Sequence, residues 1–500
     1  MGTNKPRLTK PTLDKDLEKL SSVEEATRQI SRRLAAPGTG LLFLIVAAVF
    51  AGTFATGQPG AFVVIAAATL AAYMAMNIGA NDVTNNIGAA VGARAMTMGF
   101  GLALAAVFEV AGAVIAGRGV ASTIAYDIMH SSAIGDPSIL VWAMMAALLS
   151  AAVLINAATW LGAPISTTHS IVGSVMGASI AAAGFDAVNW TTVGSITASW
   201  VFSPLLGAMV AAGFLYFLKE FVIYRDDKIE AARKWVPALI GVMTGTFLAY
   251  LLLVGLGQMV DVSVQVATGI GLICGVIAWR GLIPIIRRQS DGLENRNQSL
   301  RKLFRIPLIF AAALLSFAHG ANDVSNAIGP LAAIVSTVQS YPNGATGIAT
   351  WELVIGGLGI SLGLLLFGPK LVKLVGGEIT RLNPMRAYCV SLSTALTVII
   401  ASWVGMPVSS THIAVGAVFG VGFFREWYTR NSKRRLAYMR ARSTKFEIDW
   451  PAERNATEVQ RRRLVRRSHL MTIVAAWVIT LPVAAMLSAL IATILFATFV

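Results

Sequence analysis

The stretch "MNIGANDVTNNIG", Met76–Gly88, decides how this chain can be built. It ends a long apolar run, yet it places an aspartate and several asparagines where a membrane-spanning helix is normally apolar. A closely similar stretch, "AHGANDVSNAIGP", recurs at Ala318–Pro330. A carboxylate inside the membrane is costly and usually serves a function. The doubled stretch therefore marks a candidate site within a membrane protein.

The composition around these stretches is that of a polytopic helical membrane protein. The 500 residues are 56% hydrophobic and only 13% charged, whereas a soluble domain carries about a quarter charged residues. Apolar runs near the ~20 residues of a spanning helix recur from Gly40 onward. We therefore predict an all-α fold with about 12–13 transmembrane segments. The runs lie at 40–57, 62–93, 97–117, 138–160, 165–184, 193–218, 235–256, 262–284, 306–329, 349–369, 387–403, 409–424 and 470–499.

The distribution of basic residues predicts the orientation of the chain in the cytoplasmic membrane. With this set of spans, every Lys and Arg except Arg118 falls in loops on one side. Because cytoplasmic loops carry the excess of basic residues, the N-terminus is predicted inside and the C-terminus outside. The net charge of +15 then reflects topology, and no nucleic-acid partner is expected. The basic run "RRRLVRR", Arg461–Arg467, is expected to attract anionic membrane lipids.

A second doubled motif indicates an internal repeat. "GAPISTTHSIVG" at Gly162–Gly173 is matched by "GMPVSSTHIAVG" at Gly405–Gly416. Between the two motifs, each half places one glutamate in an apolar run, Glu109 and Glu352. The same features recur in the same order at nearly equal spacing. The second unit begins an odd number of spans after the first, so the two repeats are predicted to be inverted, with broken or half helices, as in many secondary transporters.

The repeat gives a predicted division of the chain. Two helices of the linker lack the motifs and are expected to serve as scaffold or dimer surface. The predicted parts are a cytoplasmic N-terminal segment (1–39), a first transmembrane helix (40–60), transport repeat 1 (61–218), the linker with its two scaffold helices (219–305), transport repeat 2 (306–424), a basic cytoplasmic loop (425–469) and a last helix that completes repeat 2 (470–500).

The asparagine motifs are predicted to interrupt their helices. The run 62–93 is long for one straight span, and Gly79 and Gly88 permit the backbone to leave helical geometry. Unwound backbone inside a membrane is tolerated only where it lines a buried or wet cavity. Carboxylate and amide oxygens together with freed carbonyls suit Na⁺, and amide and hydroxyl donors suit an oxyanion. The alternative is that these residues only join helices by hydrogen bonds.

The serine- and threonine-rich motifs are predicted to begin helices. Their hydroxyl groups come from Ser166, Thr167 and Thr168 in one half and from Ser409, Ser410 and Thr411 in the other. A helix N-terminus offers free N–H groups and is a ready anion site, so two such ends could hold a tetrahedral oxyanion from both sides. The repeat cores contain no Lys or Arg to clamp it, which favours charge compensation by co-bound cations. Simple capping of the two helices is the alternative.

Two pairs of ionisable residues and one single histidine also lie in or near the motifs. His169 and His412 end the second motifs and are either structural hydrogen bonders or proton-sensitive groups, since the histidine pKa lies near neutrality. Glu109 and Glu352 are expected to coordinate a cation or to face a helix N-terminus. His319 has no counterpart in the first copy, where Ile78 stands, so any role of His319 is asymmetric. No enzyme activity is expected, because the "GISLG" match to a hydrolase elbow lies inside an apolar helix.

The doubled "GANDV" and "TH" motifs resemble the inorganic phosphate transporter (PiT) family of secondary carriers, over about residues 62–500. The resemblance implies cotransport of inorganic phosphate, alone or as a metal complex, with Na⁺ or H⁺, and a homodimer. By motif position, it implies that the asparagines and aspartates line the phosphate and cation sites: Asn81, Asp82 and Asn85 with Asn322, Asp323 and Asn326. It also implies phosphate contacts from the six hydroxyl residues and a transport role for Glu109 and Glu352.

Details of the motifs bear on which cation and which substrate are expected. Some relatives that resemble proton-driven carriers have histidine in place of the asparagine before the aspartate, whereas both copies here keep asparagine. Na⁺ is therefore favoured over H⁺, and it is expected to bind at Asn81, Asp82, Asn322, Asp323, Glu109 and Glu352. Phosphate contacts are expected from Asn85, Asn326 and the six hydroxyl residues. No resident cofactor is expected. A sulfate permease of the same family and a passive anion channel remain alternatives, and Asn86 departs from the usual alanine found at Ala327.

Overall fold

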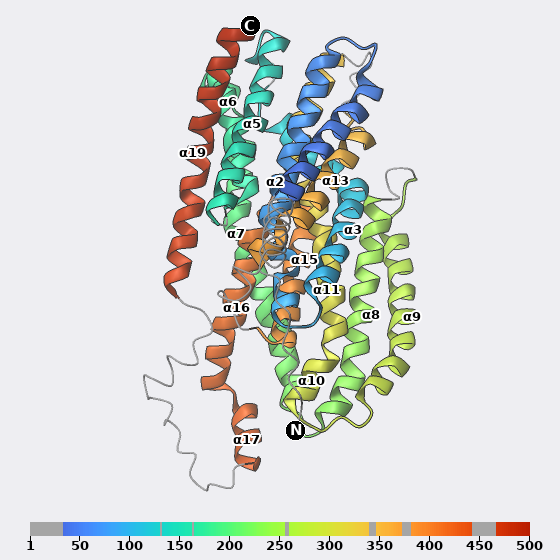
Figure 1. Ribbon diagram of the computed structural model, residues 1–500. Coiled ribbons are helices and arrows are strands. Elements are labelled where there is room, and N and C mark those ends of the chain that lie inside the picture. Colours follow the sequence, from blue (N-terminus) through green and yellow to red (C-terminus); the bar gives the residue numbers. More distant parts are fainter. Residues whose placement is uncertain are drawn as a thin grey trace, which may run out of the picture.

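The computed structural model describes residues 34–130, 133–162, 165–255, 260–339, 347–372, 382–442 and 467–500. Within these ranges the chain is built of helices that run roughly along one long axis (Figure 1). The β contact found there is an isolated bridge between Met129 and Val188. The all-α prediction is therefore confirmed.

Ten of the described helices are long and apolar enough to cross a membrane. They are Leu34–Ala55, α2 (Ala61–Gly92), α3 (Met98–Ala116), α5 (Pro137–Leu161), α7 (Trp190–Leu218) with its π-helical end η4 (Lys219–Ile223), α8 (Lys228–Val254), α9 (Val264–Ser290), α11 (Arg305–Asp323) continuing into α12 (Ser325–Gln339), α15 (Pro384–Trp403) and the Val478–Phe499 part of α19 (Arg467–Phe499).

Three further helices match the remaining predicted spans: α6 (Thr167–Ala183), α13 (Thr350–Leu366) and α16 (Ser410–Asn431). Every predicted apolar run thus corresponds to a helix. The structure also contains shorter elements that hydropathy did not predict: α4 (Arg118–Ser122), η1 (Thr123–Asp127), η3 (Phe185–Ala187), α10 (Asn297–Leu303) and α17 (Lys433–Arg442).

The predicted interruption at the first asparagine motif is wrong, because α2 is one continuous helix through Asn81–Asn86. The second motif shows only a one-residue irregularity at Val324, whose N–H still reaches the Gly320 carbonyl at 3.4 Å. Gly79 has a different purpose: a Cβ built there would lie 1.9 Å from the Ile360 carbonyl of α13. Because the backbone carbonyls stay in the helix, ligands at this motif must come from side chains.

The predicted start of the basic loop needs correction, and other predicted segments lie outside the described residues. Helix α16 continues to Asn431 and α17 follows it, so the start of the expected basic loop at 425 is helical. Residues 443–466, with most of "RRRLVRR", and residues 1–33 lie outside the described ranges.

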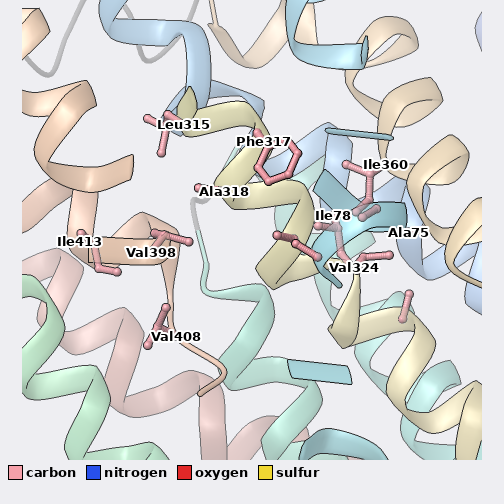
Figure 2. Packing of buried hydrophobic residues seen from close by; sticks show 14 of the residues in the cluster. Ala75, Ile78, Leu315, Phe317, Ala318, Val324, Ile360, Val398, Val408 and Ile413 are labelled. Carbon is pink, nitrogen blue, oxygen red and sulfur yellow. The ribbon is translucent and has the colours of Figure 1, made fainter. Parts of the chain in front are cut away.

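Each helix that carries an asparagine motif packs against a helix from the other half of the sequence. The first asparagine helix, α2, packs on α13, and the second, α11, packs on α3. Glycines allow backbone contact at both crossings, because a Cβ at Gly363 would lie 2.0 Å from the Met76 carbonyl and one at Gly112 would lie 2.0 Å from the Phe317 carbonyl. Figure 2 shows this packing, with Ala75 and Ile78 of α2 close to Ile360 of α13.

The remaining helices flank this centre in corresponding pairs. Helix α6 packs on α19, and α16 packs on α7. Both contacts again depend on glycine, since a Cβ at Gly177 would lie 2.0 Å from the Ala485 carbonyl and one at Gly420 would lie 2.2 Å from the Ala208 carbonyl. Helices α8 and α9 pack closely on each other and stand at the edge of the bundle (Figure 1).

Candidate functional site

Two helix N-termini meet face to face at the centre of the protein. Ser166 caps α6 and accepts the His169 N–H, while Ser409 caps α16 and accepts the His412 N–H. The two capping hydroxyl oxygens lie 3.1 Å apart. The structure therefore brings together the two serine- and threonine-rich motifs, whose six hydroxyl residues are all buried: Ser166, Thr167, Thr168, Ser409, Ser410 and Thr411.

The first aspartate lies against both helix ends. Asp82 accepts hydrogen bonds from Thr167 of α6 at 2.9 Å and from Thr411 of α16 at 3.2 Å. The Asn85 amide donates to the Thr411 hydroxyl at 2.7 Å and approaches Asp82 at 3.3 Å. Asp82 is 1% exposed, so a buried carboxylate is joined to the hydroxyl groups of both halves.

The second aspartate has the corresponding contacts. The Ser410 hydroxyl donates to Asp323 at 3.2 Å, as Thr167 does to Asp82. The Asn326 amide approaches Thr168 at 3.4 Å, as Asn85 approaches Thr411. Each asparagine motif thus faces the helix ends through one aspartate and one asparagine.

The two remaining asparagines differ in their surroundings. Asn322 secures the chain that leads into α16: its amide donates to Ser402 at 3.0 Å and its oxygen accepts the Val408 N–H at 3.2 Å. Asn81 is buried, and its amide nitrogen has no hydrogen-bond partner among the described residues. Asn322 is therefore positioned as an anchor, whereas the Asn81 amide is available to a ligand.

A buried network connects the first glutamate to the second aspartate. His319 Nδ1 lies 2.8 Å from Glu109 Oε1, and His319 Nε2 lies 2.8 Å from Asp323 Oδ2 and 3.8 Å from Asp82 Oδ2. The Asn86 amide donates to Glu109 Oε1 at 2.5 Å. The extra asparagine of the first motif and the extra histidine of the second thus converge on one carboxylate.

His319 is the site residue that the sequence analysis left without a role. Its absence from the first copy was visible, but its partners come from helices that are distant in the sequence. The one feature of the sequence that could have pointed to His319 was Glu109, because a glutamate inside the membrane needs a polar partner.

The second glutamate lacks such a network. Glu352 is 2% exposed on α13, and its Oε2 has no hydrogen-bond partner among the described residues. In the first motif, Ile78 takes the place of His319. The two glutamates are not equivalent, because Gly320 of the second motif meets the Glu109 carbonyl, whereas Gly79 of the first motif meets the Ile360 carbonyl. Ile360 therefore takes the place of Glu109 in the other half, and the predicted pairing of Glu109 with Glu352 is wrong.

The paired histidines pack against each other beside the helix ends. The rings of His169 and His412 lie edge to face with centroids 4.5 Å apart, and His169 also packs on Trp200 at 3.8 Å. Both histidines are buried. Their placement fits a structural role in joining α6 to α16.

The residues present fit both kinds of ligand that the sequence predicts. Asp82, His319 and Asp323 place one ligand atom each within 4.8 Å of one another, which suits a cation. Buried acceptors without a partner in the described part of the chain include Asp323 Oδ1 and Asn326 Oδ1, and buried polar groups normally find partners. The facing helix ends and hydroxyls suit an oxyanion.

Comparison with known proteins identifies relatives over nearly the whole chain. The profile of the phosphate transporter family matches residues 78–488. A protein of Helicobacter pylori (strain ATCC 700392 / 26695) assigned as a phosphate permease is 42% identical, with 95% of this chain and 98% of that protein covered. A Pyrococcus abyssi protein with the same assignment is 34% identical, covering 84% and 95%.

A solved structure also matches. "The sodium-dependent phosphate transporter" superposes with a TM-score of 0.74 at 31% identity, and the match covers 87% of this chain and 99% of that one.

Proposed function

Since the chain belongs to the phosphate transporter family and is a multi-pass membrane protein, we propose that it is a symporter that moves inorganic phosphate together with Na⁺ across the cytoplasmic membrane. Phosphate as substrate follows from the family. The choice of Na⁺ over H⁺ is supported by the similar structure, which is described as sodium-dependent, and by the asparagine kept in both motifs.

The observation that carries the proposal is the meeting of two aspartates with two helix N-termini. An oxyanion held by hydroxyls and N–H groups beside Asp82 and Asp323 would be repelled by their carboxylates. Cations bound at the same carboxylates remove that repulsion, because the interaction of charges is strong in a buried site. Phosphate and cation binding are thereby coupled, as symport requires.

The proposed roles follow from position. Phosphate binds at the ends of α6 and α16 through the six hydroxyl residues, with Asn85 and Asn326. Cations bind at Asp82 and Asp323, with Asn81 next to Asp82 along α2 and with His319 joining Asp323 to Glu109. Asn322 anchors the chain before α16, and Glu352 is not part of this proposed site. Because α2 is unbroken, these cation ligands are side-chain oxygens rather than freed carbonyls.

The proposed transport cycle is alternating access by two inverted repeats. The cross-packing of α2 on α13 and of α11 on α3 supports it, since each half of the chain contributes to both crossings. A loaded site with compensated charge can reorient more readily than a site with bare carboxylates.

The test is uptake of labelled phosphate into proteoliposomes with Na⁺ and pH gradients imposed separately. Uptake should follow an inward Na⁺ gradient and should be abolished in Asp82→Ala and Asp323→Ala. Excess sulfate should compete poorly. Uptake that is independent of both gradients would indicate a passive channel, and strong competition by sulfate would indicate a sulfate permease.

A further inference from the structure

A buried lysine at the end of α7 has an unusual environment. Lys219 is 6% exposed, and its ammonium lies over the rings of Tyr428 at 4.1 Å and Phe424 at 5.3 Å. Among the described residues, no carboxylate lies within ion-pair distance of it. Aromatic faces attract a cation only modestly, so this ammonium has lost its water without gaining a counter-charge.

A second cation nearby is also incompletely satisfied. Arg386, in the first turn of α15, donates through Nε to Asn383 at 3.2 Å. Its Nη1 is buried and has no hydrogen-bond partner in the described part of the chain. A guanidinium nitrogen that is buried without an acceptor is costly, which points to a ligand that supplies acceptors.

The two residues belong to one cluster of positive charge. Arg386, Arg425 and Arg435 act electrostatically on Lys219, and Arg425 and Arg301 act on Arg386. The neighbouring acid, Glu220, is engaged by the Tyr428 hydroxyl at 2.6 Å and by Arg434 at 3.3 Å. Like charges gathered in a partly buried place repel one another, and a bound anion would relieve that repulsion.

We propose that Lys219 and Arg386, with Arg425 and Arg435, form a second anion site that takes a phosphate group. A phosphate oxyanion offers several acceptors, and both the Arg386 Nη1 and the Lys219 ammonium lack one among the described residues. The site goes beyond the proposed central site, since it contains cations and no carboxylate ligand, and it needs no Na⁺ to bind its ligand.

The position of the cluster fits a ligand of this chemistry. Helix α15 contains both Arg386 and Ser402, whose hydroxyl accepts the amide of Asn322 in the central site. The part of the helix between these two residues is roughly 24 Å long at 1.5 Å per residue. Two of the neighbouring arginines belong to α10 (Arg301) and α17 (Arg435), and Figure 1 shows both helices toward the same end of the bundle, on the side predicted to be cytoplasmic. Phosphate from the central site or the phosphate of a lipid headgroup could occupy it.

The experiment uses the full chain in nanodiscs and measures equilibrium binding of labelled inorganic phosphate in Na⁺-free choline buffer. In phosphatidylcholine discs, saturable Na⁺-free binding is expected, weakened at least tenfold by Lys219→Met or Arg386→Gln. Arg386→Lys, which keeps the charge, should lose less. Arg288→Gln removes an exposed arginine on α9 and serves as the matched control without effect.

A second arm separates the two sources of the phosphate group. In discs with phosphatidylglycerol, native mass spectrometry counts retained lipids; retention that Lys219→Met and Arg386→Gln abolish would assign the site to a headgroup. If these variants weaken the binding of neither free phosphate nor lipid, the proposal of a second anion site is wrong. Phosphate binding that appears only with Na⁺ is assigned to the central site. It is measured on the same samples, where it shows that each variant is folded. Its presence or absence also tests the proposed function separately from the second site.

Discussion

The clearest asymmetry at the level of single residues is the contact of His319 and Asn86 with Glu109. Both residues were visible in the sequence as departures from the repeat. Their shared partner was not, because helix α3 is brought against α2 and α11 only by tertiary packing. Residue identity thus predicted which positions are special, whereas the structure was needed to show that they act on one carboxylate.

The first prediction concerns this carboxylate. Asn86→Ala removes the 2.5 Å amide donor to Glu109 and makes the first motif resemble the second. Loss of a hydrogen bond to a charged group costs about 1.5–3 kcal/mol, so the Na⁺ concentration for half-maximal uptake should shift several-fold or more. Measurement of phosphate uptake against Na⁺ concentration gives the shift. An unchanged Na⁺ dependence would leave Asn86 with a packing role only.

The second prediction concerns the hydroxyls at the helix ends. Thr167→Ala removes a donor to Asp82 and a candidate phosphate ligand, while Thr167→Ser keeps the hydroxyl. The alanine variant should weaken phosphate affinity roughly ten- to 150-fold, the equivalent of a hydrogen bond to a charged group. The serine variant should remain close to the unmodified protein. Titration of Na⁺-dependent phosphate binding distinguishes the two, and equal losses in both would contradict a role of the hydroxyl.

At the level of helices, the first glycine of each asparagine motif marks a place where two helices cross closely. Gly79 correctly marked the asparagine motif as a special place, but glycine serves unwinding and close approach equally well. The decision depends on α13, whose Ile360 carbonyl occupies the space of a Cβ. A single sequence does not reveal which distant helix comes that close, so the break was predicted where a crossing is found.

The third prediction tests this crossing. Gly79→Ala places a methyl group against the α13 backbone and should lower stability by about 1–3 kcal/mol, as overpacking does. The matched control is Gly213→Ala on α7, where a Cβ would meet nothing within 4 Å and where alanine favours the helix. Thermal unfolding in detergent, followed by tryptophan fluorescence, should show a loss for the first variant only. Equal midpoints would argue against a tight crossing.

For the whole molecule, hydropathy alone was enough to predict the long helices, because every long apolar run of the sequence is a helix in the structure. The short helices η1, η3 and α10 were missed because a few residues carry no periodic signal. The pairing of helices was also beyond the sequence, since α2 and α13 are far apart along the chain and meet through small residues. The buried Lys219 and the half-buried Arg386 had been counted among the basic residues of predicted loops.

The fourth prediction concerns the orientation of the whole chain. With Cys274 and Cys389 replaced by alanine, a single cysteine introduced at Val500 should react with a membrane-impermeant maleimide in intact cells, because the positive-inside rule places the C-terminus outside. A cysteine at Asn297, exposed at the start of α10, should react only after permeabilisation. The reverse pattern of labelling would mean that the predicted side is wrong.

The uninterrupted course of α2 also limits how this protein can change by insertion and deletion. In a continuous helix each added or removed residue rotates all that follows by about 100°. One such event between Gly79 and Asn86 would turn Asp82 away from Thr167 or Asn86 away from Glu109, while Gly79 stayed fixed against Ile360. An unwound segment could absorb the extra residue, but this helix cannot. The length of the motif is therefore as strictly constrained as its composition.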